Sequence, residues 1–197
     1  MRKWILISAL IAMLLAVAPA YAQGNEFKIY AAANYVSPTG SDELSIDNIV
    51  DRVEASEEAG WSIGFEGRLG KWLGLELDYL RVDQDIEQGG IKIASTSMSP
   101  LSLSANFHLI HTKILDFYFG PTISYVFWDD IKDSETGEKL STSGEWGAGV
   151  QVGLDISLIK TVAIVTGLRY QRLELTVDQQ ELAINPLYAK VGIAFRF

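Results

Sequence analysis

The clearest alternation of apolar and polar residues lies at residues 187–197. Leu187, Ala189, Val191, Ile193, Phe195 and Phe197 alternate with Tyr188, Lys190, Gly192, Ala194 and Arg196. A period of two places these sets on opposite faces of a β-strand, and about eleven residues suffice for one tilted strand across a bilayer. Such a strand has an edge that must pair with another strand. We expect it to pair with the first strand and close a barrel.

The same alternation predicts seven further strands. They cover about residues 27–35, 61–69, 73–80, 101–109, 117–127, 146–156 and 164–170. Short turns near residues 70–72, 111–116 and 158–161 alternate with longer polar loops near 37–59, 83–90, 129–143 and 177–185. Short turns at one end and longer loops at the other are typical of outer-membrane barrels. Because Pro100 cannot donate to a ladder, we expect a loop arm or an irregular strand end before residue 101.

The positions of the aromatic residues decide which face of the barrel points outward. A soluble barrel would turn the same apolar residues inward. Here the aromatic residues lie at the strand ends, with Leu, Ile, Val and Ala between them: Phe27, Trp72, Phe107, Phe117, Phe195 and Phe197 at the short-turn ends, and Tyr35, Trp61, Tyr79, Tyr125, Trp128, Trp146, Tyr170 and Tyr188 at the loop ends. Two aromatic girdles around an aliphatic band match a membrane crossing. The sequence therefore predicts an all-β fold, an eight-stranded antiparallel up-and-down transmembrane β-barrel.

Residues 1–22 have the features of a cleaved signal peptide. Arg2 and Lys3 precede an apolar run at 4–17, and Ala20-Tyr21-Ala22 resembles a small-residue cleavage site. We predict a mature barrel of residues 23–197, located in the bacterial outer membrane and surrounded by its lipid. The formal net charge of −9 argues against nucleic acid as a partner. The absence of cysteine means that no disulfide supports the fold.

The inward-facing positions carry many charged and polar residues. They include Lys28, Asn106, His108, Glu145, Gln171 and the nine residues Glu66, Arg68, Glu76, Asp78, Gln151, Asp155, Arg169, Lys190 and Arg196. The lumen of an eight-stranded barrel is about wide enough for side chains to fill. We predict that these nine residues form a structural polar network, and the alternative is a narrow polar conduit.

The loops are acidic. The first holds Asp42, Glu43, Asp47, Asp51, Glu54, Glu57 and Glu58, and the third holds Asp129, Asp130, Asp133, Glu135 and Glu138. Such runs usually form solvated faces, and the alternative is that they share divalent cations with lipopolysaccharide.

Four apolar residues interrupt the acidic first loop. Ile46, Ile49, Val50 and Val53 follow helical spacing around Asp47, which predicts a short helix. One interpretation is that they line an apolar entrance, the mouth of the barrel, for small hydrophobic solutes. The other is that they pack the loop onto the barrel rim.

The two histidines give no catalytic pattern. His108 and His111 lie near a short turn, and residues three apart on a regular strand point to opposite faces. No loop has the spacing of an EF-hand. We predict no catalytic residue, cofactor or metal site.

Several segments resemble one family of small barrels. Residues 100–108 (PLSLSANFH) with 117–120 (FYFG), 147–155 (GAGVQVGLD), 185–188 (NPLY) and 195–197 (FRF) are similar to strands of the OmpW family. This resemblance implies a passage for small hydrophobic compounds across the outer membrane. Phe195 and Phe197 also resemble the signal by which the outer-membrane assembly machinery recognises its substrates. Barrels of the OmpX type share much of the pattern, and they imply a structural or surface-interaction protein instead.

Overall fold

The computed structural model describes residues 26–39, 43–46, 49–55, 57–88, 91–129, 131–133, 139–140, 144–177, 180–183 and 185–197. Side chains are described for residues 26–37, 39, 57–83, 97–129, 144–173 and 185–197. The predicted signal peptide therefore lies outside the described residues.

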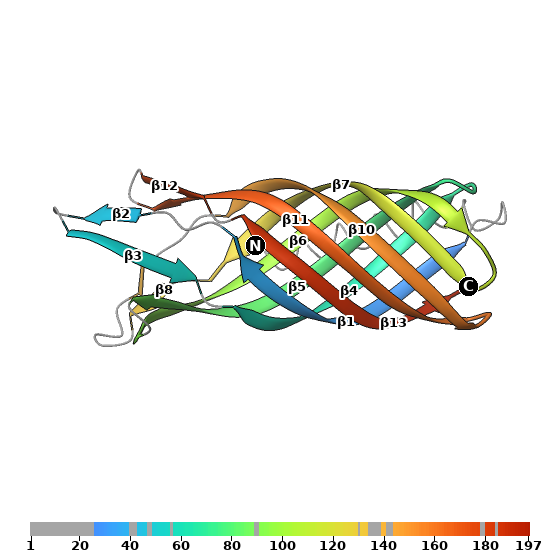
Figure 1. Ribbon diagram of the computed structural model, residues 1–197, viewed down its shortest axis with the longest axis horizontal. Coiled ribbons are helices and arrows are strands. Elements are labelled where there is room, and N and C mark those ends of the chain that lie inside the picture. The colour runs from blue at the N-terminus through green and yellow to red at the C-terminus, as the bar shows by residue number, and fades with distance from the viewer. Residues whose placement is uncertain are drawn as a thin grey trace.

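Eight long strands form a closed antiparallel barrel (Figure 1). They are β1 (Phe27–Pro38), β4 (Glu58–Leu69), β5 (Leu73–Gln88), β6 (Ile91–His111), β7 (Leu115–Trp128), β10 (Glu145–Ile159), β11 (Val162–Val177) and β13 (Pro186–Arg196). Each strand pairs with the next along the chain, and β13 pairs with β1. The predicted up-and-down barrel is confirmed.

The seam between β1 and β13 is continuous. Its register runs from Lys28 opposite Arg196 to Pro38 opposite Pro186. Beyond the last strand residue, Phe27 and Phe197 exchange two backbone hydrogen bonds of 3.0 Å each. Residue 197 thus completes the ring of hydrogen bonds, so these two strands leave no open edge.

Short strands continue beyond one end of the barrel, on the left in Figure 1. They are β2 (Glu43–Ile46), β3 (Ile49–Ala55), β8 (Ile131–Asp133), β9 (Lys139–Leu140) and β12 (Gln180–Ala183). The helix expected in the first loop is wrong, because its residues form the β2–β3 hairpin, with Ile46 opposite Ile49. Ile and Val favour extended backbone, and β3 gains a partner by pairing with β5.

The opposite end carries the short turns. Gly70 in the β4–β5 turn has φ of 77°, a left-handed conformation that favours glycine. In the β6–β7 turn, Thr112 Oγ1 accepts the backbone N–H of Leu115 at 2.8 Å. These local solutions let consecutive strands reverse within a few residues.

The outer face of the barrel is apolar, as predicted. Ile63, Val150 and Val191 are 51%, 60% and 56% exposed. Aromatic pairs lie at both rims, including Trp61 with Tyr79 at a centroid distance of 6.0 Å and Phe107 with Phe119 at 5.8 Å. An exposed apolar band between aromatic rims suits a lipid environment. No helix among the described residues is long and apolar enough to span a membrane.

Candidate functional site

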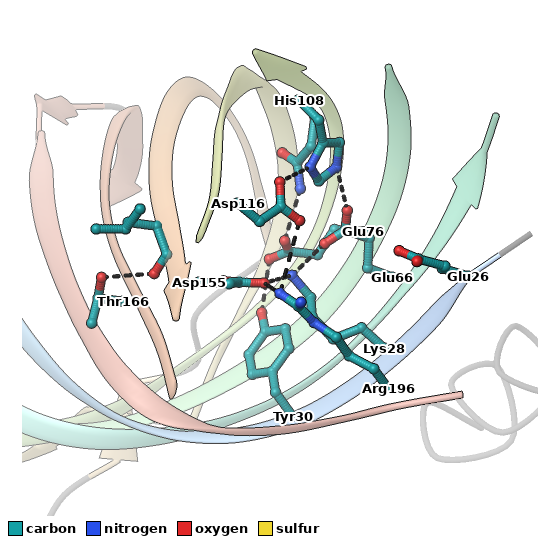
Figure 2. A network of polar contacts seen from close by, with 12 residues as sticks. Glu26, Lys28, Tyr30, Glu66, Glu76, His108, Asp116, Asp155, Thr166 and Arg196 are labelled. Carbon is teal, nitrogen blue, oxygen red and sulfur yellow. Dashed lines mark hydrogen bonds and ion pairs between the residues drawn. The ribbon is translucent and has the colours of Figure 1, made fainter. Parts of the chain in front are cut away.

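The barrel interior holds a polar network from the short-turn end to the middle, beside a small buried cluster of Tyr30, Ala32, Ala163, Val165 and Ala194, and a larger apolar cluster at the loop end. Figure 2 shows the polar side chains converging inside the curved wall. They come from the inward-facing positions of the strands, where the two-residue period places alternate side chains.

His108 is the centre of the polar layer nearest the short turns. Its Nε2 lies 2.7 Å from Glu66 Oε1, and its Nδ1 lies 2.8 Å from Asp116 Oδ1. Arg68 forms an ion pair with Asp116, and its Nη2 lies 2.8 Å from His108 Nδ1. The sequence predicts Asp116 in a turn, whereas it lies buried in β7.

His111 joins the same layer, so the expectation that the two histidines face opposite sides is wrong. The β6–β7 register shifts between His108 and Ile110, and His111 Nδ1 lies 2.8 Å from Arg68 Nη1. A β-bulge adds one residue to a strand and so changes the face of the residues that follow it. Among the described residues, no group of three or more His, Cys, Asp or Glu side chains is arranged to hold a metal ion.

Lys28 connects this layer to the middle of the lumen. Its Nζ lies 2.5 Å from Glu66 Oε2 and 2.9 Å from Asp155 Oδ2. Arg196 also reaches Asp155, at 3.0 Å. Opposite charges from β1, β4, β10 and β13 thus neutralise one another across the barrel, as the low local dielectric requires.

Glu76 is the hub of the middle layer and is 0% exposed. Its Oε1 accepts hydrogen bonds from Tyr30 Oη at 2.7 Å and from Lys190 Nζ at 2.8 Å. Its Oε2 accepts from Asn106 Nδ2 at 2.9 Å. Gln151 on β10 and Arg169 on β11 also approach it, at 3.5 and 3.7 Å, so the carboxylate is surrounded by polar protein groups from five strands.

Arg169 caps the polar part of the lumen. Its guanidinium donates to Asp78 Oδ1 at 2.6 Å, to Ser102 Oγ at 2.9 Å and to Gln151 Oε1 at 2.9 Å. The structure thus places all nine residues singled out from the sequence in the barrel interior, each with polar partners. Sequence reasoning left Tyr30 and Asp116 out of the network, although an inward period-two position marks Tyr30.

Two interior cavities show how closely these layers are filled. One is at the short-turn end beside Glu26 and Arg68, and the other lies between Asn34 and Arg169. Each leaves about 10 Å³ for the centre of a water molecule, which is about enough for one water.

An apolar cluster closes the lumen at the loop end. Its members are 0–4% exposed: Val36, Leu80, Val82, Met98, Val126, Trp128, Leu173 and Tyr188. Trp128 and Tyr188 were expected in the outer girdle, but both point into the barrel. In the sequence, this cluster is marked by the inward positions of β5, which change from acidic Glu76 and Asp78 to apolar Leu80 and Val82. The residues proposed for the mouth, Ile46, Ile49, Val50 and Val53, lie on β2 and β3, and their side chains are outside the described ones.

The wall beside this cluster has a gap in its hydrogen-bond ladder. Tyr79 pairs with Leu101 and Val82 with Met98, but the described β5–β6 ladder includes no pair between them. Pro100 lies within β6 at this gap, whereas the sequence predicts that the regular strand begins after it. A proline has no N–H to donate, which accounts for the break. On the outer surface at this gap, Arg81 Nη2 lies 3.3 Å from both Ser97 Oγ and Asp129 Oδ2.

Comparison with known proteins agrees with this architecture. The family model described as "Outer membrane protein beta-barrel domain" matches residues 8–197. The chain belongs to this family. It is accordingly a protein of the bacterial outer membrane, surrounded by membrane lipid. No curated protein matches the chain.

Solved structures with low sequence identity share the fold. The outer membrane protein OprG from Pseudomonas aeruginosa matches with a TM-score of 0.75 at 15% identity, over 88% of this chain and 96% of that one. The outer membrane protein AlkL, solved in DMPC bilayers, matches with a TM-score of 0.64 at 14% identity, over 88% and 90%. The E. coli outer membrane protein W matches with a TM-score of 0.56 at 20% identity, over 88% and 98%. These neighbours confirm the predicted resemblance to small barrels of the OmpW type.

Proposed function

We propose that the barrel is a passive route by which small hydrophobic molecules enter the outer membrane. The observation that carries this proposal is the position of the apolar cluster directly beside the ladder gap at Pro100. Leu80, within the gap, and Met98, in the pair that flanks it, both belong to the cluster. A hydrophobic molecule that reaches the cluster from the loop end therefore has an apolar surface leading to a break in the wall.

The filled polar layers favour an exit sideways rather than along the axis. Below the cluster, Arg169, Asp78 and Gln151 are bonded to one another across the lumen. A hydrophobic solute would have to break these buried bonds to continue towards the short turns, and nothing in the solute would replace them. Between β5 and β6 at Pro100 the ladder already lacks the hydrogen bond that a proline cannot donate, so an exit there has fewer ladder bonds to break than one through a regular part of the wall.

A second break in the wall is less suited to this role. It lies between β6 and β7 beside Pro121, where the ladder skips from Ser104–Thr122 to Phe107–Phe119. A Cβ atom on Gly120 would collide with the carbonyl oxygen of Ala105, so the two backbones lie very close there. The interior residue at that height is the polar Asn106, which belongs to the network.

A reversible disulfide across the gap tests the proposed route. Arg81 and Ser99 stand opposite each other if the flanking register is continued through the gap, and the chain has no native cysteine. We expect the oxidised Arg81→Cys/Ser99→Cys variant to slow uptake of a hydrophobic fluorescent probe into proteoliposomes to the rate of empty vesicles. Reduction should restore the uptake.

The matched control is a disulfide across an intact part of the ladder. Ile63→Cys/Tyr79→Cys joins two paired residues of β4 and β5 and should leave uptake unchanged. Equal uptake by the oxidised and reduced gap variant would refute an exit at Pro100. Equal uptake by all proteins and by empty vesicles would refute the transport function itself.

The alternative is a structural or surface-interaction barrel that presents its acidic loops to cations, lipopolysaccharide or another cell. The closely filled polar layers favour it, because a network such as that around Glu76 is sufficient to hold a barrel rigid. This function predicts no probe uptake by any variant. It also predicts that removing the loop carboxylates changes binding to lipopolysaccharide in the presence of divalent cations.

The proposed mouth is tested separately from the exit. We propose that Ile46, Ile49, Val50 and Val53 line the entry at the loop end. A variant with serine at all four positions should slow probe uptake if they form this entry. Unchanged uptake would instead favour the interpretation that they pack the loop onto the rim.

The route to the membrane is also a proposal. We infer that residues 1–22 are removed as a signal peptide, and that Phe195 and Phe197 are recognised by the assembly machinery. N-terminal sequencing of the protein from outer-membrane fractions should then begin at Gln23. Phe197→Ala should reduce the amount of assembled barrel, whereas the control Phe119→Ala, at the same rim but away from the C-terminal strand, should reduce it less.

A further inference from the structure

A small cavity lies at the base of the apolar cluster, and Tyr188 belongs to both. The cavity is bounded on one side by apolar Leu80 and on the other by polar Asn34, Asp78 and Arg169. It is therefore the place where the apolar and polar parts of the lumen meet. The inference below rests on the proposed function and names the class of molecule that the cluster takes.

The hydroxyl of Tyr188 is a buried polar group with no partner among the described residues. The side chain is 4% exposed, and no described group lies within hydrogen-bond geometry of its Oη atom. Tyrosine hydroxyls that are buried usually do find a partner. Because Tyr188 also lines the cavity, its hydroxyl is a candidate partner for a molecule bound there.

The other polar groups around the cavity are already paired. Arg169 donates to Asp78, Ser102 and Gln151. The Asn34 amide donates to Ser62 Oγ at 2.8 Å. The other cation in the described wall, Lys190, is paired with Glu76 at 2.8 Å. An incoming carboxylate would therefore find both cations already neutralised, and an unpaired charge is costly to bury. A neutral polar group suits the cavity better.

A second donor in the same cluster points to the same chemistry. The indole Nε1 of Trp128 is also buried without a partner among the described residues, and an indole N–H can only donate. The cluster therefore combines an apolar surface with hydrogen-bond donors that need an acceptor. A pure hydrocarbon would fill the apolar surface but would leave these donors unsatisfied.

We propose that the cluster and its cavity bind a small amphiphile, an aliphatic chain that ends in one neutral oxygen, such as a primary alcohol or a ketone. The oxygen occupies the cavity and is hydrogen-bonded to Tyr188 Oη, and the chain packs among Leu80, Val82 and Met98. The cavity leaves about 10 Å³ for the centre of a water-sized group, which matches one terminal oxygen. Met98 is flexible enough to repack around the chain.

The test compares 1-octanol with n-octane. Each is titrated, at equal mole fraction in the lipid, into the ¹⁵N-labelled full barrel in lipid nanodiscs. Binding is followed through the indole N–H signal of Trp128, which is assigned with Trp128→Phe. One additional hydrogen bond predicts that wild type binds octanol about five-fold more tightly than octane. Tyr188→Phe should remove this preference and leave the binding of octane unchanged.

Tyr170→Phe is the matched control, because Tyr170 lies on β11 in the outer girdle and is 44% exposed. It should change neither titration. Tyr188→Phe removes an unpaired hydroxyl and keeps the ring, so the barrel should fold with unchanged heat-modified gel mobility. If that variant nevertheless fails to fold, the preference of the wild type for octanol over octane decides the question.

The outcomes separate this inference from the proposed function. Equal binding of octanol and octane by wild type would overturn the inference and leave the hydrophobic route intact. The partner of the Tyr188 hydroxyl would then be water. Binding of octanoate more tightly than octanol would overturn the assignment of a neutral oxygen. Binding of neither probe would overturn the inference and the proposed function together.

Discussion

Replacing Glu76 with glutamine tests whether the lumen network stabilises the barrel. Glu76→Gln keeps the size of the side chain but removes its negative charge. Lys190 then loses the carboxylate that lies 2.8 Å from its Nζ. One of the two Glu76 oxygens also becomes an NH₂ group, which faces donors from Tyr30 and Lys190 or from Asn106.

The burial of this site sets the expected magnitude. Glu76 is 0% exposed and the Lys190 side chain is 9% exposed, so water does not replace the lost partner. Removing one member of a buried ion pair typically costs about 3–5 kcal/mol, because the other charge stays buried. We expect Glu76→Gln to lower the free energy of unfolding by that amount. A Lys190→Gln change in the same chain should recover part of the loss, because it removes the orphaned charge.

Reversible denaturant unfolding in lipid vesicles measures these free energies, with tryptophan fluorescence and gel mobility as independent readouts. Asp83→Asn is the matched control: its carboxylate is 82% exposed and 3.7 Å from Arg81, so the expected change is within about 0.5 kcal/mol. A loss below about 1 kcal/mol for Glu76→Gln, or strict additivity with Lys190→Gln, would show that water solvates the hub and that the network is not dry.

Three further changes test the wall of the barrel. Leu77→Arg, in the middle of the lipid face, should lower the free energy of unfolding by about 2–4 kcal/mol, whereas Leu158→Arg near a short turn should lower it by about 0–1 kcal/mol. Equal losses of the two variants, measured by unfolding in vesicles, would contradict this placement of the membrane. Gly153→Ala should lower the free energy of unfolding by about 1–3 kcal/mol, because the added Cβ would lie 2.6 Å from Tyr118 Cε2. The same loss in a Tyr118→Leu background would argue against this contact. Arg81→Ala should speed probe uptake, because Arg81 connects the strands outside the gap, and an unchanged rate would place the exit elsewhere.

The period-two pattern and the positions of the aromatic residues together predicted the membrane barrel from the sequence. Alternation in eight segments predicted the strands, and the aromatic residues at their ends predicted which face meets lipid. This works because each strand in a membrane must satisfy its backbone by pairing and must present apolar side chains to lipid. Both constraints act along each strand, so the alternation and the aromatic ends of a strand are enough to assign the orientation of residues such as Ile63 and Val150.

Local patterns failed where pairing with another strand decided the outcome. The spacing of Ile46, Ile49 and Val53 fits a helix, but β3 pairs with β5 and the segment is a hairpin. His108 and His111 stand three residues apart, but a bulge against β7 brings both to Arg68. In each case a distant strand supplied the hydrogen bonds that set the backbone conformation.

The sequence by itself also determined that the lumen holds paired charges, because Glu66, Glu76 and Arg169 occupy inward positions. Which charge meets which was decided only by the closed barrel, since Glu76 and Lys190 are 114 residues apart. The apolar cluster at the loop end likewise required the tertiary structure, because its eight members come from six strands. Strand tilt and register bring such residues to one height of the barrel, and these depend on how all eight strands close.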